Sequence, residues 1–167
     1  MTTKLIKGGT VVNATGTATA DVLVDDSTIA AVLAPGSSML GVDLEAAVDE
    51  VVDASGRYVI PGGIDAHTHM ELPFGGTNAS DTFETGTRAA AWGGTTSIID
   101  FAVQRYGERV EDGLAAWHAK AAGNCAIDYG FHQIIGGIDE FSLKAMDTLI
   151  DDAVAAGVVV KTERQPL

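Results

Sequence analysis

The residues best suited to chemistry are two histidines, His67 and His69, at the end of the run Asp65-Ala66-His67-Thr68-His69. This run stands at the carboxyl end of a short predicted strand. Because side chains alternate along a strand, both imidazoles are expected on one side, with Cα atoms roughly 6.6 to 7 Å apart. Imidazole is a common zinc ligand, and a catalytic zinc site has about three protein ligands and an open position for water. The pair therefore predicts part of a metal site; the alternative is two polar loop histidines.

Three more polar residues are expected near the same edge of a sheet. Asp100 stands near the end of the second predicted strand of this series, His132 at the end of the third, and Lys161 after the fourth. In parallel α/β folds, the carboxyl ends of the strands carry the functional loops. The alternative role for Asp100 and His132 is hydrogen bonding or loop capping. The alternative for Lys161 is an ordinary solvated lysine.

Two other side chains have simpler interpretations. His118 stands beside Trp117 in a predicted helix and is interpreted as a surface or packing histidine. Cys125 is the only cysteine, has no basic neighbour in sequence and stands at the start of a predicted apolar strand, so we interpret it as a buried residue that fills space in the core. The sequence contains no nucleophile elbow, phosphate-binding loop, dinucleotide fingerprint or His-Glu-x-x-His motif.

The first 57 residues predict a small β domain. Short runs of Val, Ile and Leu alternate there with turns that contain Gly or Asp, which is typical of strands. The segment 37–50 is compatible with one helical turn or with a loop. The predicted strands are Lys4–Ile6, Thr10–Asn13, Asp21–Val24, Ile29–Leu33 and Val51–Val52.

From residue 58 onward, strands alternate with helices, which predicts parallel βαβ units. Asp81 and Glu84 resemble a capping box and predict the start of a helix that ends at about Trp92. The run from Thr96 to Phe101 is typical of a strand covered on both faces. Four strands indicate either a small open sheet or half of an eight-stranded barrel. The predicted elements are a short strand from 58 to about 67, helix 81–92, strand 96–101, helix 110–121, strand 126–131, helix 139–156 and a strand beginning at 158.

The composition predicts a soluble protein with a hydrophobic core. Hydrophobic residues make up 46% of the chain, and 10 Lys and Arg stand against 23 Asp and Glu, a formal net charge of −13. That acidic balance disfavours a nucleic-acid partner, because binding to phosphates depends on Lys and Arg. No apolar run is long enough to span a membrane, and the first residues lack an apolar signal core. We therefore expect a cytoplasmic protein with no membrane partner.

Several runs resemble a known family. The run Val59-Ile60-Pro61-Gly62-Gly63-Ile64-Asp65-Ala66-His67-Thr68-His69 resembles the first barrel strand of the amidohydrolase superfamily. The next residues, Met70-Glu71-Leu72-Pro73-Phe74-Gly75-Gly76-Thr77, are similar to the dihydropyrimidinase and hydantoinase group of cyclic amidohydrolases. Later runs resemble the same group: Gly86-Thr87-Arg88-Ala89-Ala90-Ala91, Gly93-Gly94-Thr95-Thr96-Ser97 and Ile127-Asp128-Tyr129-Gly130-Phe131-His132.

This resemblance implies an α/β fold with two parts. Residues 58–167 would form about four strands of an incomplete (β/α)8 TIM-type barrel, and residues 1–57 would form part of a small β-sandwich. The resemblance also implies two divalent metal ions, usually zinc, bridged by a carboxylated lysine and a hydroxide. His67 and His69 are the implied ligands of one ion, and Lys161 is the implied bridging lysine. A homo-oligomer is implied as well, a tetramer in relatives.

The tail departs from the pattern of this group. Gly157-Val158-Val159-Val160-Lys161 is one residue short of the usual run before the bridging lysine, and residues 162–167 contain no tyrosine. From about Ala153 we therefore expect the sequence to be out of register. Two further metal histidines and the catalytic aspartate of the family are expected beyond this chain, which we interpret as an inactive amino-terminal fragment.

The activity implied by the resemblance is metal-dependent hydrolysis of the cyclic amide bond of a dihydropyrimidine or hydantoin, a reaction of pyrimidine catabolism that yields an N-carbamoyl amino acid. Two alternatives remain open. A non-catalytic assembly protein on the same fold is disfavoured by the presence of both His67 and His69. A sibling enzyme acting on dihydroorotate or allantoin is disfavoured by the segment from Met70 to Thr77. The sequence does not decide the preferred ring or its handedness.

Overall fold

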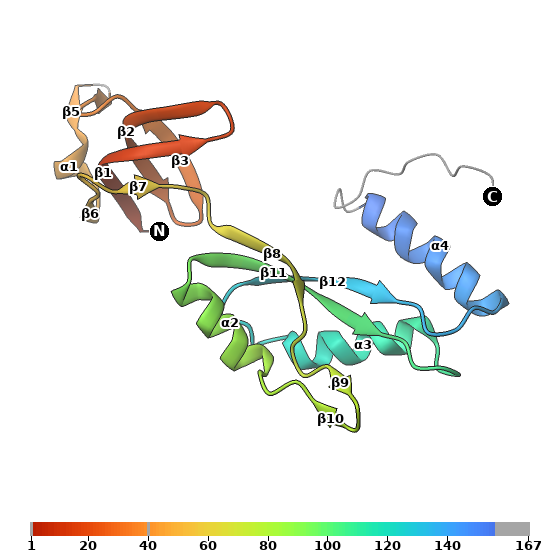
Figure 1. The fold of residues 1–167 in the computed structure, drawn as a ribbon. Helices are drawn as coiled ribbons and strands as arrows, with labels where there is room; N and C mark the ends of the chain where they lie inside the picture. The colour runs from red at the N-terminus through yellow and green to blue at the C-terminus, as the bar shows by residue number, and fades with distance from the viewer. Residues whose placement is uncertain (1, 40, 156–167) are drawn as a thin grey trace. The chain divides into compact units, whose positions relative to one another are not determined.

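The computed structural model describes residues 2–39 and 41–155 and divides the chain into two compact units, 1–61 and 62–167 (Figure 1). The sequence analysis places this boundary after residue 57. The boundary falls after Pro61 because Tyr58–Val59 pairs with the first strand of the chain, so these residues belong to the first unit. Each unit is described by itself.

The first unit is built on a five-stranded sheet. Its strand order is β3-β2-β1-β6, and β7 also pairs with β1. β1 is antiparallel to β2 and parallel to β6 and β7. A β-bulge between Ile6 and Gly9 joins two runs that the sequence predicted as separate strands. The strands are β1 (Thr3–Asn13), β2 (Gly16–Asp25), β3 (Thr28–Leu33), β6 (Glu50–Asp53) and β7 (Tyr58–Val59).

The segment between β3 and β6 contains one helical turn, which resolves the choice left open by the sequence. Two short strands, β4 (Ser38–Met39) and β5 (Val42–Asp43), precede α1 (Leu44–Ala47). The Asp43 side chain caps this turn by accepting a hydrogen bond from the Glu45 N–H. Leu44 is buried against Leu5 and Leu23, so the turn closes the apolar side of the sheet.

A buried carboxylate stabilises the same unit. Asp21 is only 4% exposed. Its two oxygens accept hydrogen bonds from the backbone N–H groups of Gly8, at 2.7 Å, and Gly36, at 2.9 Å. Asp21 therefore joins the bulge of β1 to the turn after β3.

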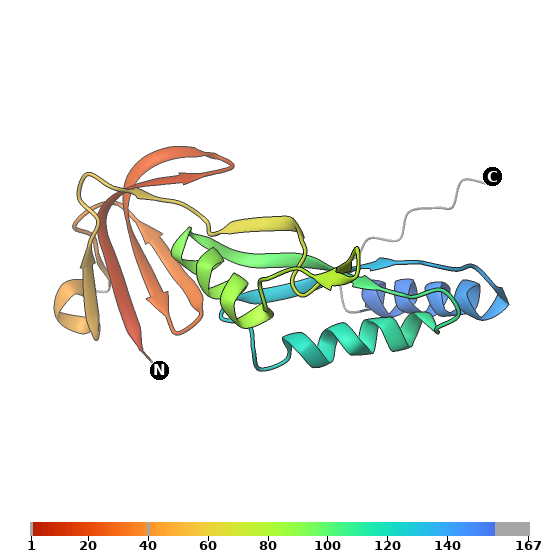
Figure 2. The ribbon, with the colours of Figure 1, turned by 60° about the horizontal axis from the view of Figure 1, so that its bottom comes forward.

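The second unit contains parallel strands that alternate with helices, as the sequence predicted. The sheet order is β12-β11-β8, and both pairs are parallel. Helices α2 and α3 pack against the sheet on the same side, as Figure 2 shows, and α4 packs beside α3. The predicted strand beginning at Val158 lies outside the described residues. The elements are β8 (Gly63–Thr68), the hairpin β9 (Pro73–Phe74) and β10 (Thr77–Asn78), α2 (Phe83–Trp92), β11 (Thr95–Val103), α3 (Val110–Ala121), β12 (Asp128–Ile134) and α4 (Glu140–Ala155).

Two sequence predictions at the start of this unit are wrong in detail. The run beginning at Tyr58 forms two separate strands, β7 and β8, because the Pro-Gly-Gly sequence between them interrupts the pairing. The cap of α2 is Thr82, with Thr85 as its partner, not Asp81 with Glu84. The Thr82 hydroxyl accepts from the Thr85 N–H at 3.1 Å, and the Thr85 hydroxyl accepts from the Thr82 N–H at 3.0 Å. Two hydroxyl groups thus satisfy two of the free backbone donors at the start of α2.

The core of this unit lies between β11 and its covering helices. Ile98, Asp100 and Ala102 are buried at every second position of β11, while the residues between them are half-buried. The sequence predicted a strand covered on both faces; in β11 one face is buried and the other is half-buried. The buried cluster consists of Phe83, Ile98, Ala102, Trp117 and Ala121.

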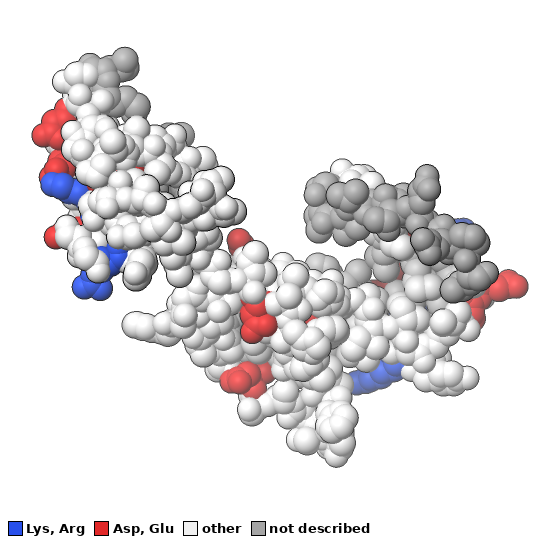
Figure 3. Space-filling view, turned by 45° about the horizontal axis from the view of Figure 1, so that its top comes forward, with Lys and Arg blue, Asp and Glu red and all other residues white. Residues whose placement is uncertain are grey.

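Charged side chains lie on the surface of both units, and Figure 3 shows acidic residues on each of them. In the first unit, Lys4 forms an ion pair with Glu50 at 2.7 Å, and Lys7 forms one with Glu45. These partners are about half exposed, so each pair adds little to stability. Among the described residues, no helix is both long and apolar enough to cross a lipid bilayer.

The contact between α3 and β11 generates a prediction for Gly113. A Cβ atom at this position would lie 2.7 Å from the backbone oxygen of Val103, which cannot move without disturbing the strand. We expect Gly113→Ala to destabilise the protein by about 1 to 3 kcal/mol, although alanine favours a helix. Urea unfolding measures this change. The control is Ala115→Gly, at an exposed position of α3, with an expected loss of about 1 kcal/mol. A Gly113→Ala protein more stable than the parent would contradict the expectation.

The pairing of Asp49 with Thr3 predicts a pH-dependent stability. Asp49 accepts hydrogen bonds from the Thr3 N–H at 2.7 Å and the Thr3 hydroxyl at 3.0 Å, and these bonds lower the pKa of Asp49 below its ordinary value of 3.8. The ionised carboxylate therefore stabilises the folded state above that value, and this contribution disappears as the pH falls through the lowered pKa. We expect Asp49→Asn to unfold at a lower temperature near pH 7 and the difference to vanish in acid. A difference that is constant with pH would disprove this.

Candidate metal centre

The rings of His67 and His69 lie next to each other. Their centroids are 5.0 Å apart, the ring planes are perpendicular, and both residues are exposed. His67 is in β8, and His69 follows the last residue of that strand. The adjacency agrees with the expectation from strand alternation. Metal binding by the two rings stays a prediction.

A β-bulge, which the sequence analysis missed, shapes the strand that carries the pair. β8 pairs Asp65 with Ile98 and Thr68 with Asp100, so β8 has one more residue than β11 between these two points. Asp65 also accepts a hydrogen bond from the N–H of His67 at 3.1 Å. A bulge re-aims side chains relative to a regular strand. The ring positions are therefore set by the irregular pairing as well as by alternation.

The ring of Phe101, on β11, packs against both histidine rings. Its ring centroid lies 4.5 Å from that of His67 and 5.1 Å from that of His69. On its other side, the Phe101 ring lies 4.8 Å from the ring of His132. Phe101 was not singled out from the sequence. The available signal was that Phe101 alternates with the buried residues of β11 and therefore faces away from the helices.

The positions of Asp100 and His132 favour their hydrogen-bonding interpretation. Asp100 is completely buried, and it accepts hydrogen bonds from the Thr68 hydroxyl at 3.0 Å and the Met70 N–H at 2.7 Å. His132 is exposed, and its Nε2 atom lies 3.0 Å from the backbone oxygen of Ala66. Both residues thus bind the backbone or side chains of the segment that carries the histidine pair.

The remaining sequence candidates lie away from this pair or outside the described residues. His118 is exposed on α3, and its ring packs at 4.9 Å from that of Phe131, as expected for a packing histidine. Cys125 is half-buried against the core and precedes β12, so it is not the first residue of a strand. Burial raises the pKa of the Cys125 thiol, and the nearby Asp100 adds to this shift. Lys161 lies outside the described residues.

The two imidazoles fit a zinc-type cation as part of a site. Both rings are exposed and lie next to each other, and their nitrogen atoms are ligands that suit zinc and related ions. Within the part of the chain that the structure describes, no group of three or more His, Cys, Asp or Glu side chains is arranged to hold a metal ion. A complete metal site would therefore need ligands besides these two imidazoles.

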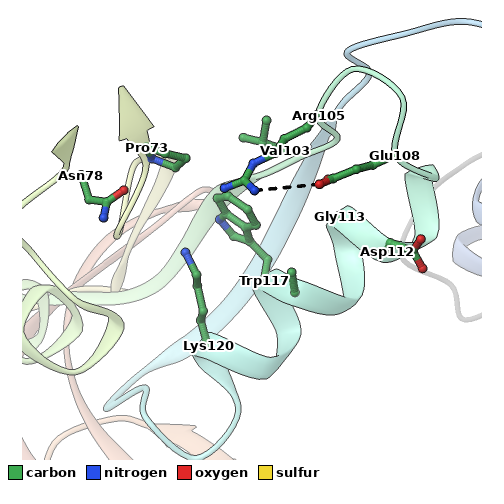
Figure 4. Close-up of a pocket in the computed structure, with 10 residues that line it drawn as sticks. Pro73, Asn78, Val103, Arg105, Glu108, Asp112, Gly113, Trp117 and Lys120 are labelled. Carbon is green, nitrogen blue, oxygen red and sulfur yellow. Dashed lines mark ion pairs between the residues drawn. The ribbon is translucent and has the colours of Figure 1, made fainter. Parts of the chain in front are cut away.

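A separate groove lies beside α3 (Figure 4). It has a volume of about 460 Å³ and extends from α3 to the hairpin of β9 and β10. Lys120 Nζ lies 4.4 Å from the centroid of the Trp117 ring, and Arg105 pairs with Glu108 at 3.9 Å. None of the histidines lines this groove, so it is not the candidate metal centre.

Comparison with known proteins identifies relatives that match most of this chain. Residues 50–126 match the model of the amidohydrolase family. A D-hydantoinase of Streptomyces coelicolor is 56% identical over 91% of this chain, which covers 32% of that protein. A dihydropyrimidinase of Rattus norvegicus is 39% identical over 89% of this chain, which covers 28% of that protein.

A solved structure gives the same result. The crystal structure of a dihydropyrimidinase from Brevibacillus agri aligns with 90% of this chain with a TM-score of 0.80 and 45% sequence identity. The alignment covers 31% of that structure. The chain thus spans about a third of the length of the relatives that it matches.

The environment of Cys125 predicts a slow thiol. Because the raised pKa leaves less thiolate, we expect iodoacetamide to modify Cys125 more slowly at pH 8 in the folded protein than in urea. The rate should rise further as the pH is increased beyond 9. The control combines Cys125→Ser with Ala115→Cys, which places the thiol on an exposed part of α3. Equal rates for the two folded proteins would contradict the expectation.

Proposed function

Because this chain belongs to the amidohydrolase family, in the group of hydantoinases and dihydropyrimidinases, we propose that it is the amino-terminal part of an enzyme that hydrolyses the cyclic amide bond of a hydantoin or dihydropyrimidine. The product is an N-carbamoyl amino acid. The observation that carries the proposal is the adjacency of the His67 and His69 rings at 5.0 Å. The proposal concerns a longer protein, and the 167-residue chain alone is proposed to be inactive.

The proposed fold of the longer protein is a (β/α)8 barrel preceded by a β-sandwich. Its support is the parallel order β8-β11-β12, with α2 and α3 on one side of the strands. In such a barrel the helices lie outside, and the carboxyl ends of the strands carry the active site. Three histidines lie at or near these ends. His67 is in β8, His69 directly follows β8, and His132 is near the end of β12.

In this proposal, His67 and His69 hold one divalent cation, zinc, through their ring nitrogens. Lys161, outside the described residues, is proposed as the carboxylated lysine between this ion and a second one. When bound, the cations lower the pKa of water and polarise the amide carbonyl. Other residues of this chain hold the two histidines in place. The Phe101 ring packs against both histidine rings. The His132 ring hydrogen-bonds to the backbone oxygen of Ala66, which directly precedes His67.

The alternatives receive less support. A non-catalytic assembly protein is not favoured, because the relatives that match most of this chain are named as hydantoinases and dihydropyrimidinases. The same names disfavour a sibling enzyme for dihydroorotate or allantoin. The carboxylate expected to transfer the proton to the leaving nitrogen is not assigned to a described residue.

A homo-oligomer in the cytoplasm completes the proposal. Among the described strands, β8 and β12 each pair on one side only, so each presents an edge. Ile64 and Phe74 are large apolar residues of the second unit with exposures of 69% and 81%. Exposed edges and apolar side chains favour association, with the rest of the longer protein or with further copies.

The test uses the longest reading frame that contains this chain. The purified protein is expected to bind zinc and to hydrolyse hydantoin or dihydrouracil faster than dihydroorotate or allantoin. His67→Ala and His69→Ala should each lower bound zinc and reduce kcat/KM by more than about 100-fold, because even residues behind a metal ligand contribute about 10- to 100-fold. His118→Ala, on the exposed side of α3, is the matched control and should retain activity. A metal-free protein that hydrolyses none of these rings would refute the proposal.

A further inference from the structure

Asp100 uses both carboxylate oxygens to connect three parts of the second unit. One oxygen, Oδ2, accepts from the Thr68 hydroxyl and the Met70 N–H. The other, Oδ1, accepts from the Phe101 N–H at 2.8 Å and from Nε1 of Trp117 at 3.1 Å. The residue is 0% exposed. A carboxylate that accepts four hydrogen bonds satisfies its full acceptor capacity without water.

The donors on Oδ2 bracket the second histidine. Thr68 stands between His67 and His69, and Met70 follows His69. The chain then turns at Glu71, whose φ of 53° is in the left-handed region that residues other than glycine rarely adopt. A strained backbone persists only where surrounding contacts hold it. The hydrogen bonds to Asp100 are contacts of this kind, immediately before the turn.

One of the two donors on Oδ1, the indole N–H of Trp117, extends the connection to α3. Trp117 is 5% exposed, belongs to the buried core cluster and is fixed by its packing there. Its indole N–H is therefore a donor in a fixed position on the face of the sheet that the helices cover. The carboxylate of Asp100 is held between this donor and the segment that carries the histidines.

We propose that Asp100 is a positioning residue that sets the separation of the His67 and His69 rings, and that Trp117 fixes the orientation of its carboxylate. The part of this inference that concerns cation affinity rests on the proposed function. The part that concerns the ordering of residues 68–70 does not. Displacement of a ligand by about 1 Å is enough to weaken a designed or natural site, so the loss of Asp100 should be measurable in both respects.

The variants separate positioning from general stability. Asp100→Asn keeps the shape but replaces one oxygen by an NH2 group. This group faces either the donors of Thr68 and Met70 or those of Phe101 and Trp117, so two of the four hydrogen bonds are lost in either orientation. Asp21→Asn makes the same change at the buried carboxylate of the first unit, which accepts hydrogen bonds from Gly8 and Gly36. Thr68→Val removes one donor to Asp100, whereas Thr68→Ser retains it. Trp117→Phe removes one donor on the opposite oxygen.

The first measurement is metal-free and uses the 167-residue chain. Hydrogen exchange of the Met70 amide or of the Trp117 indole N–H, whichever faces the new NH2 group, is expected to become about 10-fold faster in Asp100→Asn, because that donor loses its acceptor. It should be unchanged in Asp21→Asn. The His67 and His69 ring resonances should shift in Asp100→Asn and Thr68→Val but not in Thr68→Ser. Unchanged exchange and unchanged ring resonances in a folded Asp100→Asn protein would overturn the proposal.

The second measurement is calorimetric titration with Zn²⁺ alone of the longest reading frame that contains this chain, because the two histidines are only part of the proposed site. Asp100→Asn and Thr68→Val should raise the Kd about 10-fold, within the range for residues behind metal ligands. Trp117→Phe should raise it less, and Thr68→Ser and Asp21→Asn should leave it unchanged. An unchanged Kd in Asp100→Asn would refute the cation part of the inference. If the longer parent protein binds no Zn²⁺ while the exchange result holds, the proposed metal function fails and the positioning role stands. If Asp100→Asn does not fold, the comparison of Thr68→Val with Thr68→Ser decides.

Discussion

The second unit depends on the register of β11, the strand that is hydrogen-bonded to parallel neighbours on both sides. Alternate residues of this strand have different surroundings: Ile98 and Ala102 are buried under the helices, whereas the ring of Phe101 contacts histidines on the opposite face. A shift of one residue would exchange these two faces. The register that buries the core therefore also determines which side chains meet at the candidate metal centre.

Elements with strong periodicity could be predicted from the sequence. The apolar spacing in α3 gave its bounds, Val110 to Ala121, because the helix buries one stripe against a sheet. The alternation of strands and helices from residue 58 onward predicted parallel pairing, because a helix that crosses between two strands lets both run in the same direction. The adjacency of His67 and His69 also followed from a local rule, since both lie on one extended segment. These features depend on residues that are close together in the chain.

Other features depend on partners far away in the sequence. The bulge between Asp65 and Thr68 exists only in relation to β11, and a single strand shows no sign of it. The contact of Phe101 with His132 requires the register of β11 with β12. Tyr58 and Val59 read as the start of the barrel strand, yet they pair with β1, because pairing partners and not apolar content decide where a short strand belongs. Local patterns cannot specify such pairings.

In the proposed site, two histidine ligands favour some cations over others but do not decide which cation binds. Imidazole nitrogens favour zinc and related ions over calcium and magnesium, which prefer oxygen ligands. Two such ligands do not distinguish among the first-row transition metals, because these follow the same order of affinity at most nitrogen sites. The described residues hold the two rings in position. Both rings pack against Phe101, and Thr68, which stands between them, is hydrogen-bonded to Asp100. Ligands that are ordered before a cation arrives lose less conformational freedom on binding. The placement of these two imidazoles thus resides in β8 and β11. In the proposed metal site, the selection of the metal would depend on the residues that complete its coordination.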